Sequence, residues 1–218
     1  LTHPDALSKE VAASAAGELK DAETLPVLER LSRSNSLNVK VAALRSMAIL
    51  NDKEAEKELQ RVAREGDLFA IYALSLFSGS EETLAELQSH PNPNARLNAT
   101  LALLALKDKR AFKGLPEILF RDARDLSFLP LTSPGSTLYA YRIVPSSKQN
   151  LEEQEAAHFS SLALREEILN SVLDIDDEAF FQLSTLIFSR QQTDLIPLLI
   201  ELLESKGGPR AEALLKAE

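Results

Sequence analysis

Apolar residues recur along most of this chain at the spacing of amphipathic helices, and the helices come in pairs. The clearest pair covers residues 38–66, where Val41, Leu44 and Met47 share one face of the first helix. The corner between its two helices is Leu50-Asn51-Asp52, in which the aspartate suits a helix N-cap. Two short helices cannot bury both apolar stripes alone, so the pattern predicts stacking on further copies.

The same corner recurs on either side of this pair. Leu19-Lys20-Asp21 comes 31 residues earlier, and Leu106-Lys107-Asp108 comes 56 residues later, with room for a shorter pair between. The periodicity therefore predicts four helix pairs over residues 1–125. The expected helices cover residues 6–19, 22–33, 38–50, 53–65, 68–77, 80–89, 94–106 and 109–121.

The repeat pattern stops at Asp125, and residues 126–150 form an irregular insertion rich in proline and tyrosine. Residues 138–144 favour a β-strand, with 128–131 as the partner of a short hairpin. A long insertion in a regular array is often functional, and a poorly ordered loop is the alternative. Its side chains best suited to anchor a partner are those of Tyr139, Tyr141 and Arg142.

Residues 151–218 are predicted to continue the array as helices over about 151–173, 178–189 and 194–205. The last of these is apolar on all sides, which predicts burial between neighbours. The sequence begins at Leu1 without a methionine and stops in what reads as a further first helix, so we expect a fragment of a longer protein. Its compartment stays open, with the cytoplasm favoured, because a targeting segment could precede Leu1.

The repeated units resemble HEAT-like repeats of the short bacterial type that is also seen in phycobilisome lyases. Residues 39–43 (VKVAA) and 95–99 (ARLNA) match the opening of such a unit, and 209–213 (PRAEA) starts another. The resemblance covers residues 6–125 well and 178–218 loosely. It implies an all-α fold, a right-handed α-solenoid of stacked antiparallel helix pairs.

Two details of the resemblance concern single positions. The glycine that the family places in the corner is replaced by Lys20, Asn51 and Lys107. The family would also join a basic residue to a corner aspartate in the neighbouring repeat, and capping with surface charge is the alternative. The residues concerned are the basic Lys40, Arg96 and Arg210 and the acidic Asp21, Asp52 and Asp108.

Charge and residue usage exclude several function classes. The net charge of −9 lies entirely in residues 151–218, with 14 acidic and 5 basic side chains, whereas residues 1–150 carry 19 of each. A generic nucleic-acid binder would instead show a basic excess. The absence of cysteine excludes disulfides, thiolate zinc sites and a cysteine nucleophile. No apolar run approaches the roughly 18 residues of a membrane span.

The sequence also lacks a motif for catalysis or for a cofactor. It has no phosphate-binding glycine loop, dinucleotide fingerprint or nucleophile elbow. His3, His90 and His158 are scattered, so we expect no metal site, no cofactor and no catalytic residues.

One cluster appears when the repeats are superposed on one another. Arg30 aligns with Arg61, and Arg33 aligns with Arg64, on second helices that would line the concave face of a HEAT-like solenoid. These arginines, called the basic column below, would suit an acidic peptide or protein segment. The alternative is that basic residues near helix C-termini complement the helix dipole.

The sequence therefore predicts a monomeric, non-catalytic protein–protein interaction scaffold. It would grip an acidic or extended protein partner on the concave face or through the insertion. The alternative that the resemblance implies is a phycobilisome-lyase-like or chaperone-like accessory that holds a client or cofactor. That alternative rests on fold analogy alone.

Overall fold

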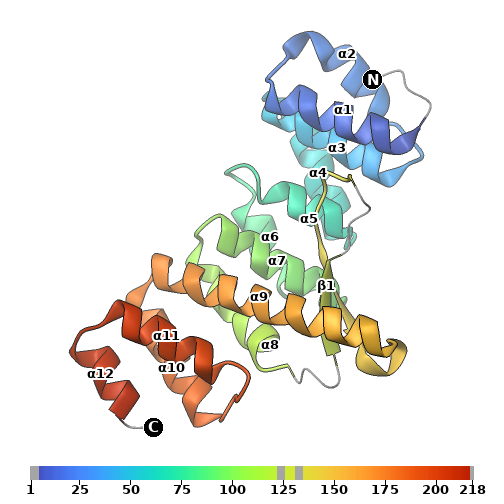
Figure 1. Ribbon diagram of the computed structural model, residues 1–218. Helices are drawn as coiled ribbons and strands as arrows, with labels where there is room; N and C mark the ends of the chain where they lie inside the picture. Colours follow the sequence, from blue (N-terminus) through green and yellow to red (C-terminus); the bar gives the residue numbers. More distant parts are fainter. Residues whose placement is uncertain (1–4, 122–125, 131–134, 217–218) are drawn as a thin grey trace. The chain divides into compact units, whose positions relative to one another are not determined.

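A computed structural model describes residues 5–121, 126–130 and 135–216, and these residues are mostly helical, which confirms the expected all-α class (Figure 1). The chain forms two compact units. Unit 1 comprises Leu1–Leu106 and Pro130–Arg142, and unit 2 comprises Lys107–Leu129 and Ile143–Glu218. The insertion is thus divided between the two units, because its middle belongs to unit 1 and its ends to unit 2.

Unit 1 is built from the first helix pairs that the periodicity predicted. Helix α1 packs on α3, α3 on α5 and α5 on α7, and each second helix packs on the next first helix. The helices are α1 (Ala6–Glu18), α2 (Leu25–Leu31), α3 (Leu37–Ile49), α4 (Lys53–Arg64), α5 (Leu68–Leu74), α6 (Glu81–Leu87) and α7 (Pro93–Ala105), with the 3-10 turn η1 (Ala22–Thr24) before α2. Apolar side chains from consecutive pairs therefore share one core.

The corners between helices have the left-handed backbone that a glycine would favour. Lys20, Asn51 and Lys107 adopt φ angles of 51°, 69° and 57°, at the three positions where the resemblance to HEAT-like repeats predicts a glycine. Gln191, just after helix α10 (Asp177–Ser189) of unit 2, repeats this conformation with a φ of 51°. An asparagine tolerates the left-handed region better than a lysine or a glutamine does. The shared conformation shows that the helix ends are equivalent in spite of their different residues.

The corner aspartates cap the elements that follow them. Asp21, Asp52 and Asp108 each accept a hydrogen bond from the backbone N–H two residues later, over 2.9–3.1 Å. Lys40 and Arg210 do not join these aspartates, because their side chains pair with glutamates instead, over 2.9 Å and 2.6 Å. The capping alternative therefore holds at the aspartates, and the expected link between repeats is not made by these two basic residues.

Helices α1 and α3 are in close contact at Gly17. A β-carbon on Gly17 would lie 2.5 Å from the Ser46 hydroxyl oxygen and 2.8 Å from the Ser46 α-carbon. Ser46 is itself buried, and its hydroxyl donates to the carbonyl of Ala13 over 2.7 Å. The contact between the first two pairs thus depends on the absence of a side chain at residue 17.

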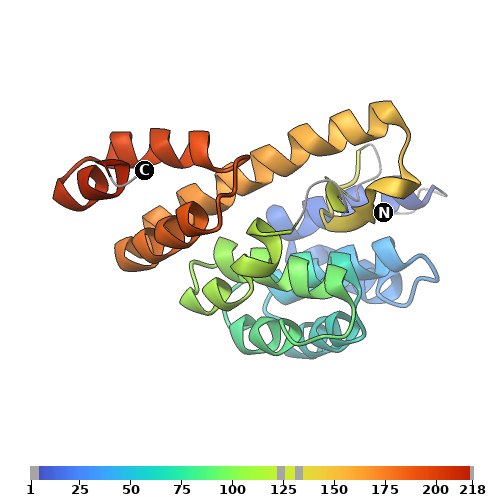
Figure 2. The ribbon, with the colours of Figure 1, turned by 90° about the horizontal axis from the view of Figure 1, so that it is seen from below.

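Unit 2 contains the remaining helices and most residues of the two strands. Helix α9 packs on α10 and α11, and α11 packs on α12; Figure 2 shows α9 as one long uninterrupted helix. The elements are η2 (Lys109–Lys113), α8 (Leu115–Leu119), η3 (Ser146–Lys148), α9 (Leu151–Ile175), α10 (Asp177–Ser189), α11 (Ile196–Lys206) and α12 (Pro209–Lys216). On α11 Leu199 and Leu203 are fully buried, and Leu198, Ile200 and Leu202 are half-buried.

The insertion contains two paired strands. They are β1 (Leu126–Pro130) and β2 (Tyr141–Pro145), where the sequence predicted strands at 128–131 and 138–144. Arg165 of α9 is buried close to them and donates to the carbonyl of Arg121 over 3.0 Å. Its guanidinium lies 6.0 Å from the Phe128 ring centre, which joins α9 to this part of unit 2.

Candidate functional site

Unit 1 holds an extended piece of the insertion, residues 136–141, across its helices. The segment is neither helix nor strand up to Ala140, and Leu138 and Ala140 are buried at alternate positions. It forms hydrogen bonds with Glu10 of α1, and its Tyr139 ring packs on the Tyr72 ring of α5. Its backbone also forms a hydrogen bond with the side chain of Asn98 on α7. We call residues 136–141 the docked segment.

One end of the docked segment is fixed by a buried carboxylate on α1. Glu10 is only 2% exposed, and its Oε1 accepts hydrogen bonds from the Ser136 hydroxyl over 2.6 Å and the Thr137 backbone N–H over 3.0 Å. The hydroxyl oxygens of Ser14 and Thr137 lie 2.7 Å apart. A buried carboxylate is costly unless such donors compensate it, so Glu10 and the segment require each other.

The other end is fixed by a side-chain amide on α7. Asn98, 5% exposed, accepts from the Tyr141 backbone N–H at Oδ1 over 2.8 Å and donates from Nδ2 to the Tyr141 carbonyl over 2.6 Å. The side-chain amide of Asn98 therefore forms hydrogen bonds with both the backbone N–H and the backbone carbonyl of Tyr141. This mode of binding recognises an extended backbone and is independent of the side chain that the residue carries.

The insertion residues expected as interface anchors are placed differently from one another. Tyr139 and Tyr141 are half-buried and meet edge to face, with ring centres 5.1 Å apart and hydroxyl oxygens 2.9 Å apart. Tyr139 also packs against Tyr72 of α5, at 6.2 Å between centres. Arg142 is exposed and forms no ion pair within the described ranges. The tyrosines thus anchor the segment to its own unit.

Two arginines of the basic column are engaged in ion pairs on their own surface. Arg61 pairs with Glu58 over 2.7 Å and with Glu65. Arg64 donates to Glu86 over 3.1 Å and to the Thr83 hydroxyl over 2.9 Å, which connects α4 with α6. Their positive charge is locally balanced, so they offer less to an acidic partner than the sequence alignment predicts.

The other two arginines of the column remain available. Arg30 on α2 and Arg33 just after it are exposed, and neither forms an ion pair in the part of the chain that the structure describes. Of the expected cationic positions, Arg30, Arg33 and Arg142 therefore keep an uncompensated charge. All three belong to unit 1.

Glu58 gives a testable pH dependence to this surface. Hydrogen bonds from Arg61 and Lys40 lower the pKa of Glu58 from 4.5 to about 2. Because the pKa is lowered on folding, the stabilisation is complete above pH 4.5 and is lost as the pH falls toward 2. We expect Glu58→Gln to remove up to about 1 kcal/mol at pH 7, since the carboxylate is partly exposed, and less at pH 3.

Urea unfolding at pH 7, 4 and 3 measures this difference, with Glu54→Gln as the matched control. Glu54 also pairs with a lysine, Lys57, over 2.8 Å, but its side chain is 83% exposed. The control should follow the wild type at each pH. A Glu58→Gln variant with the wild-type loss of stability between pH 4 and pH 3 would contradict the assignment.

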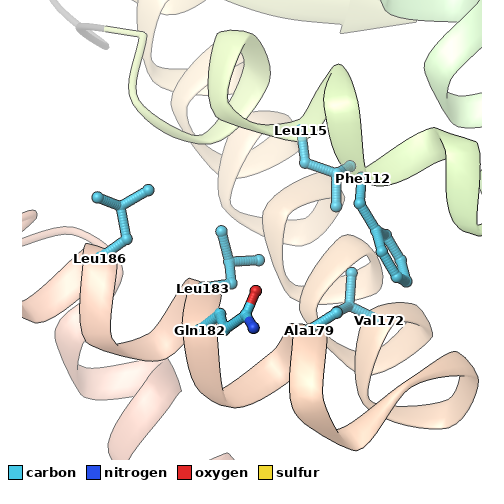
Figure 3. Close-up of a pocket in the computed structure, with 7 residues that line it drawn as sticks. All are labelled: Phe112, Leu115, Val172, Ala179, Gln182, Leu183 and Leu186. Atoms are coloured by element: carbon cyan, nitrogen blue, oxygen red, sulfur yellow. The ribbon is translucent and has the colours of Figure 1, made fainter.

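Unit 2 contains an apolar cavity of about 210 Å³ that no sequence pattern predicted (Figure 3). Phe112 and Leu115 line it from the η2–α8 region, and Val172 and Leu183 line it from α9 and α10. The polar lining side chain, Gln182, already donates to Glu178 over 3.0 Å. The cavity can accept an apolar group, but it provides no acid, base or nucleophile for catalysis.

The residues that fix the docked segment were missed by the sequence reasoning, although a signal existed. In the repeat register, Glu10 takes the place of Val41 and Asn98 takes the place of Ala42, and both of those equivalents are buried. A polar residue in a buried apolar stripe indicates a specific buried partner. The repeat pattern does not predict which residues that partner would be, because the docked segment lies more than 100 residues from Glu10 in the sequence.

Metal and membrane sites are not found among the described residues. No group of three histidine, aspartate or glutamate side chains is placed to hold a metal ion there. Within the same ranges, no helix combines the length and apolarity that a membrane span requires. Comparisons with protein-family models, with curated proteins and with solved structures give no match.

Proposed function

We propose that this protein is a non-catalytic scaffold of HEAT-like helix pairs, arranged as a right-handed α-solenoid, that binds protein partners. The observation that carries the proposal is the docked segment. Unit 1 fixes an extended polypeptide across α1, α5 and α7, with Glu10 and Asn98 bound to its backbone. Stacked helix pairs provide extended surfaces for binding of this kind.

The partner is best sought around the exposed cationic side chains of unit 1. Arg30, Arg33 and Arg142 carry charges that no carboxylate in the described ranges balances. An acidic protein segment would pair with them at little desolvation cost, which favours fast and specific association. Arg61 and Arg64 would contribute less, because an incoming carboxylate must displace their present partners.

Site-specific photo-crosslinking in the source cells tests the proposal. We would place benzoylphenylalanine singly at Arg30, Arg33 and Arg142, with exposed Glu23 and Lys216 as control positions. We expect one discrete protein adduct from at least one arginine position and none from the controls, and the adduct partner, once purified, should bind the wild-type chain. Absence of adducts at all three positions, or equal adducts at the controls, would refute a partner site at this surface.

A further inference from the structure

Helix α9 begins with an exposed face that carries two large apolar side chains. Leu151 is 72% exposed and Phe159 is 71% exposed, although most apolar residues of their size in the described chain are buried. The Phe159 ring also meets the His158 ring edge on, with centres 6.1 Å apart. Together with Gln154 and Glu155 they line a shallow hollow, and we call these five residues the α9 face.

The α9 face has the spacing of a helix–helix contact. Residues 151, 154, 155, 158 and 159 stand at i, i+3, i+4, i+7 and i+8, which is the stripe that an amphipathic helix turns toward a neighbour. The start of the stripe is fixed, because the Asn150 side chain and the Glu153 side chain each bond the other's backbone N–H over 2.9 Å. The two apolar anchors are therefore about 12 Å apart along a rigid helix.

The second half of α9 differs, since its apolar residues are covered within unit 2. Leu164, Ile168 and Leu169 are buried, and α9 packs there on α10 and α11. Among the first ten residues of α9, which form its gold end in Figure 2, only Ala157 is buried.

The electrostatics of the α9 face favour a cationic partner. Between Lys148 and Arg165 the sequence contains no lysine or arginine, whereas Glu152, Glu153 and Glu155 are all exposed. None of the three forms an ion pair with a described residue. Carboxylates in the first turn also stabilise a helix start, but Glu155 lies beyond that turn and within the α9 face.

We propose that the α9 face binds a basic amphipathic helix of a partner protein. This inference rests on the proposed scaffold function and adds a second surface to it. Leu151 and Phe159 would enter the apolar side of the partner helix, and lysines or arginines beside that stripe would pair with Glu152 and Glu155. A second copy of this chain is a poor occupant, since pairing two α9 faces would bring like charges together.

The test uses two synthetic 18-residue peptides that differ in the sign of their charge. Each has leucine along one helical face, and the remaining positions are lysine in one peptide and glutamate in the other. Binding of labelled peptide to the full chain is followed by fluorescence anisotropy at low and high salt. The variants are Phe159→Ser and the pair Glu152→Gln with Glu155→Gln. The matched control is Leu19→Ser, which removes an apolar side chain that is 79% exposed in unit 1.

We expect the lysine peptide to bind the wild type and Leu19→Ser equally. Phe159→Ser should weaken it about tenfold or more, because an aromatic anchor contributes a large share of the affinity. The double glutamine variant should weaken it and reduce the dependence on salt. All three variants change exposed side chains, so circular dichroism should show the wild-type helix content.

Three results would overturn the proposal. The first is that the glutamate peptide binds as tightly as the lysine peptide, and the second is that Leu19→Ser weakens binding as much as Phe159→Ser does. The third is a concentration-dependent dimer in sedimentation velocity that Phe159→Ser abolishes. The last result would assign the face to a second copy of the chain. A partner crosslinked through Arg30, Arg33 or Arg142 would leave the scaffold function standing even if the α9 face fails this test.

Discussion

Replacing Asn98 by alanine should lower the free energy of unfolding by about 1–3 kcal/mol, because the partly buried N–H and carbonyl of Tyr141 each lose a hydrogen bond. Asn98 is the residue that satisfies both the N–H and the carbonyl of Tyr141 from helix α7. Without it, the docked segment should also separate from unit 1 at its Tyr141 end. Urea unfolding measures the first effect, and hydrogen exchange at the Tyr141 amide measures the second.

The chain offers a matched control for this variant. Asn98 also donates from Nδ2 to the carbonyl of Asn94, four residues earlier, over 2.8 Å. The exposed Asn170 of α9 makes the same bond to the carbonyl of Glu166 over 3.0 Å. Asn170→Ala should change stability by only about 0.5 kcal/mol, and toward greater stability, because alanine is the better helix former. If Asn98→Ala were equally harmless and left the Tyr141 amide protected, the docked segment would not depend on Asn98.

Replacing Gly17 by alanine should lower the free energy of unfolding by about 1–3 kcal/mol, as overpacking in a well-packed core does. Helix propensity alone predicts the opposite sign, since alanine in a helix is favoured over glycine by about 1 kcal/mol. The new methyl group would lie 2.8 Å from the α-carbon of Ser46 on α3. A backbone atom cannot relieve this clash by changing rotamer, as the end of a side chain could. Chemical denaturation decides between the two signs.

Ala15→Gly in the same helix isolates the propensity effect, because Ala15 is exposed. It should cost about 1 kcal/mol without any change in packing. Combining Gly17→Ala with Ser46→Gly removes the serine β-carbon and hydroxyl from the contact, so it should recover part of the loss in Gly17→Ala. A Gly17→Ala variant more stable than the wild type would show that α1 and α3 can separate at no cost.

Local rules predicted the helices well, because each is specified by nearby residues. The apolar stripes gave the first helices of unit 1 to within one to three residues at their ends. Spacing along one helix would also have predicted the engagement of Arg61, since Glu58 and Glu65 stand at i−3 and i+4 from it. The alignment of arginines between repeats did not predict this pairing, because it compares equivalent positions of different repeats and leaves out the carboxylates next to each arginine on its own helix.

The insertion was predicted less well, for a reason that lies in the backbone. A strand was expected from residue 138, but β2 begins at Tyr141. Leu138 and Ala140 are buried and alternate with exposed or half-buried positions, as strand residues do, although their segment pairs with side chains of helices. An extended chain has the same period of two whether its backbone is bonded to a strand or to Glu10 and Asn98. The sequence pattern therefore could not distinguish these two partners.

Synthesis on the ribosome proceeds from the N-terminus, and this order has a consequence for the docked segment. Asn98 is made 43 residues before Tyr141, which corresponds to about 2–9 s at about 5–20 residues per second. During that interval residues 107–129 of unit 2 are made, and until Tyr141 follows, Glu10 and Asn98 lack the docked segment. The last hydrogen bonds of unit 1 thus form only after synthesis of unit 2 has begun. A gene truncated after Leu106 would encode all seven helices of unit 1 and leave their buried carboxylate and amide permanently without the docked segment.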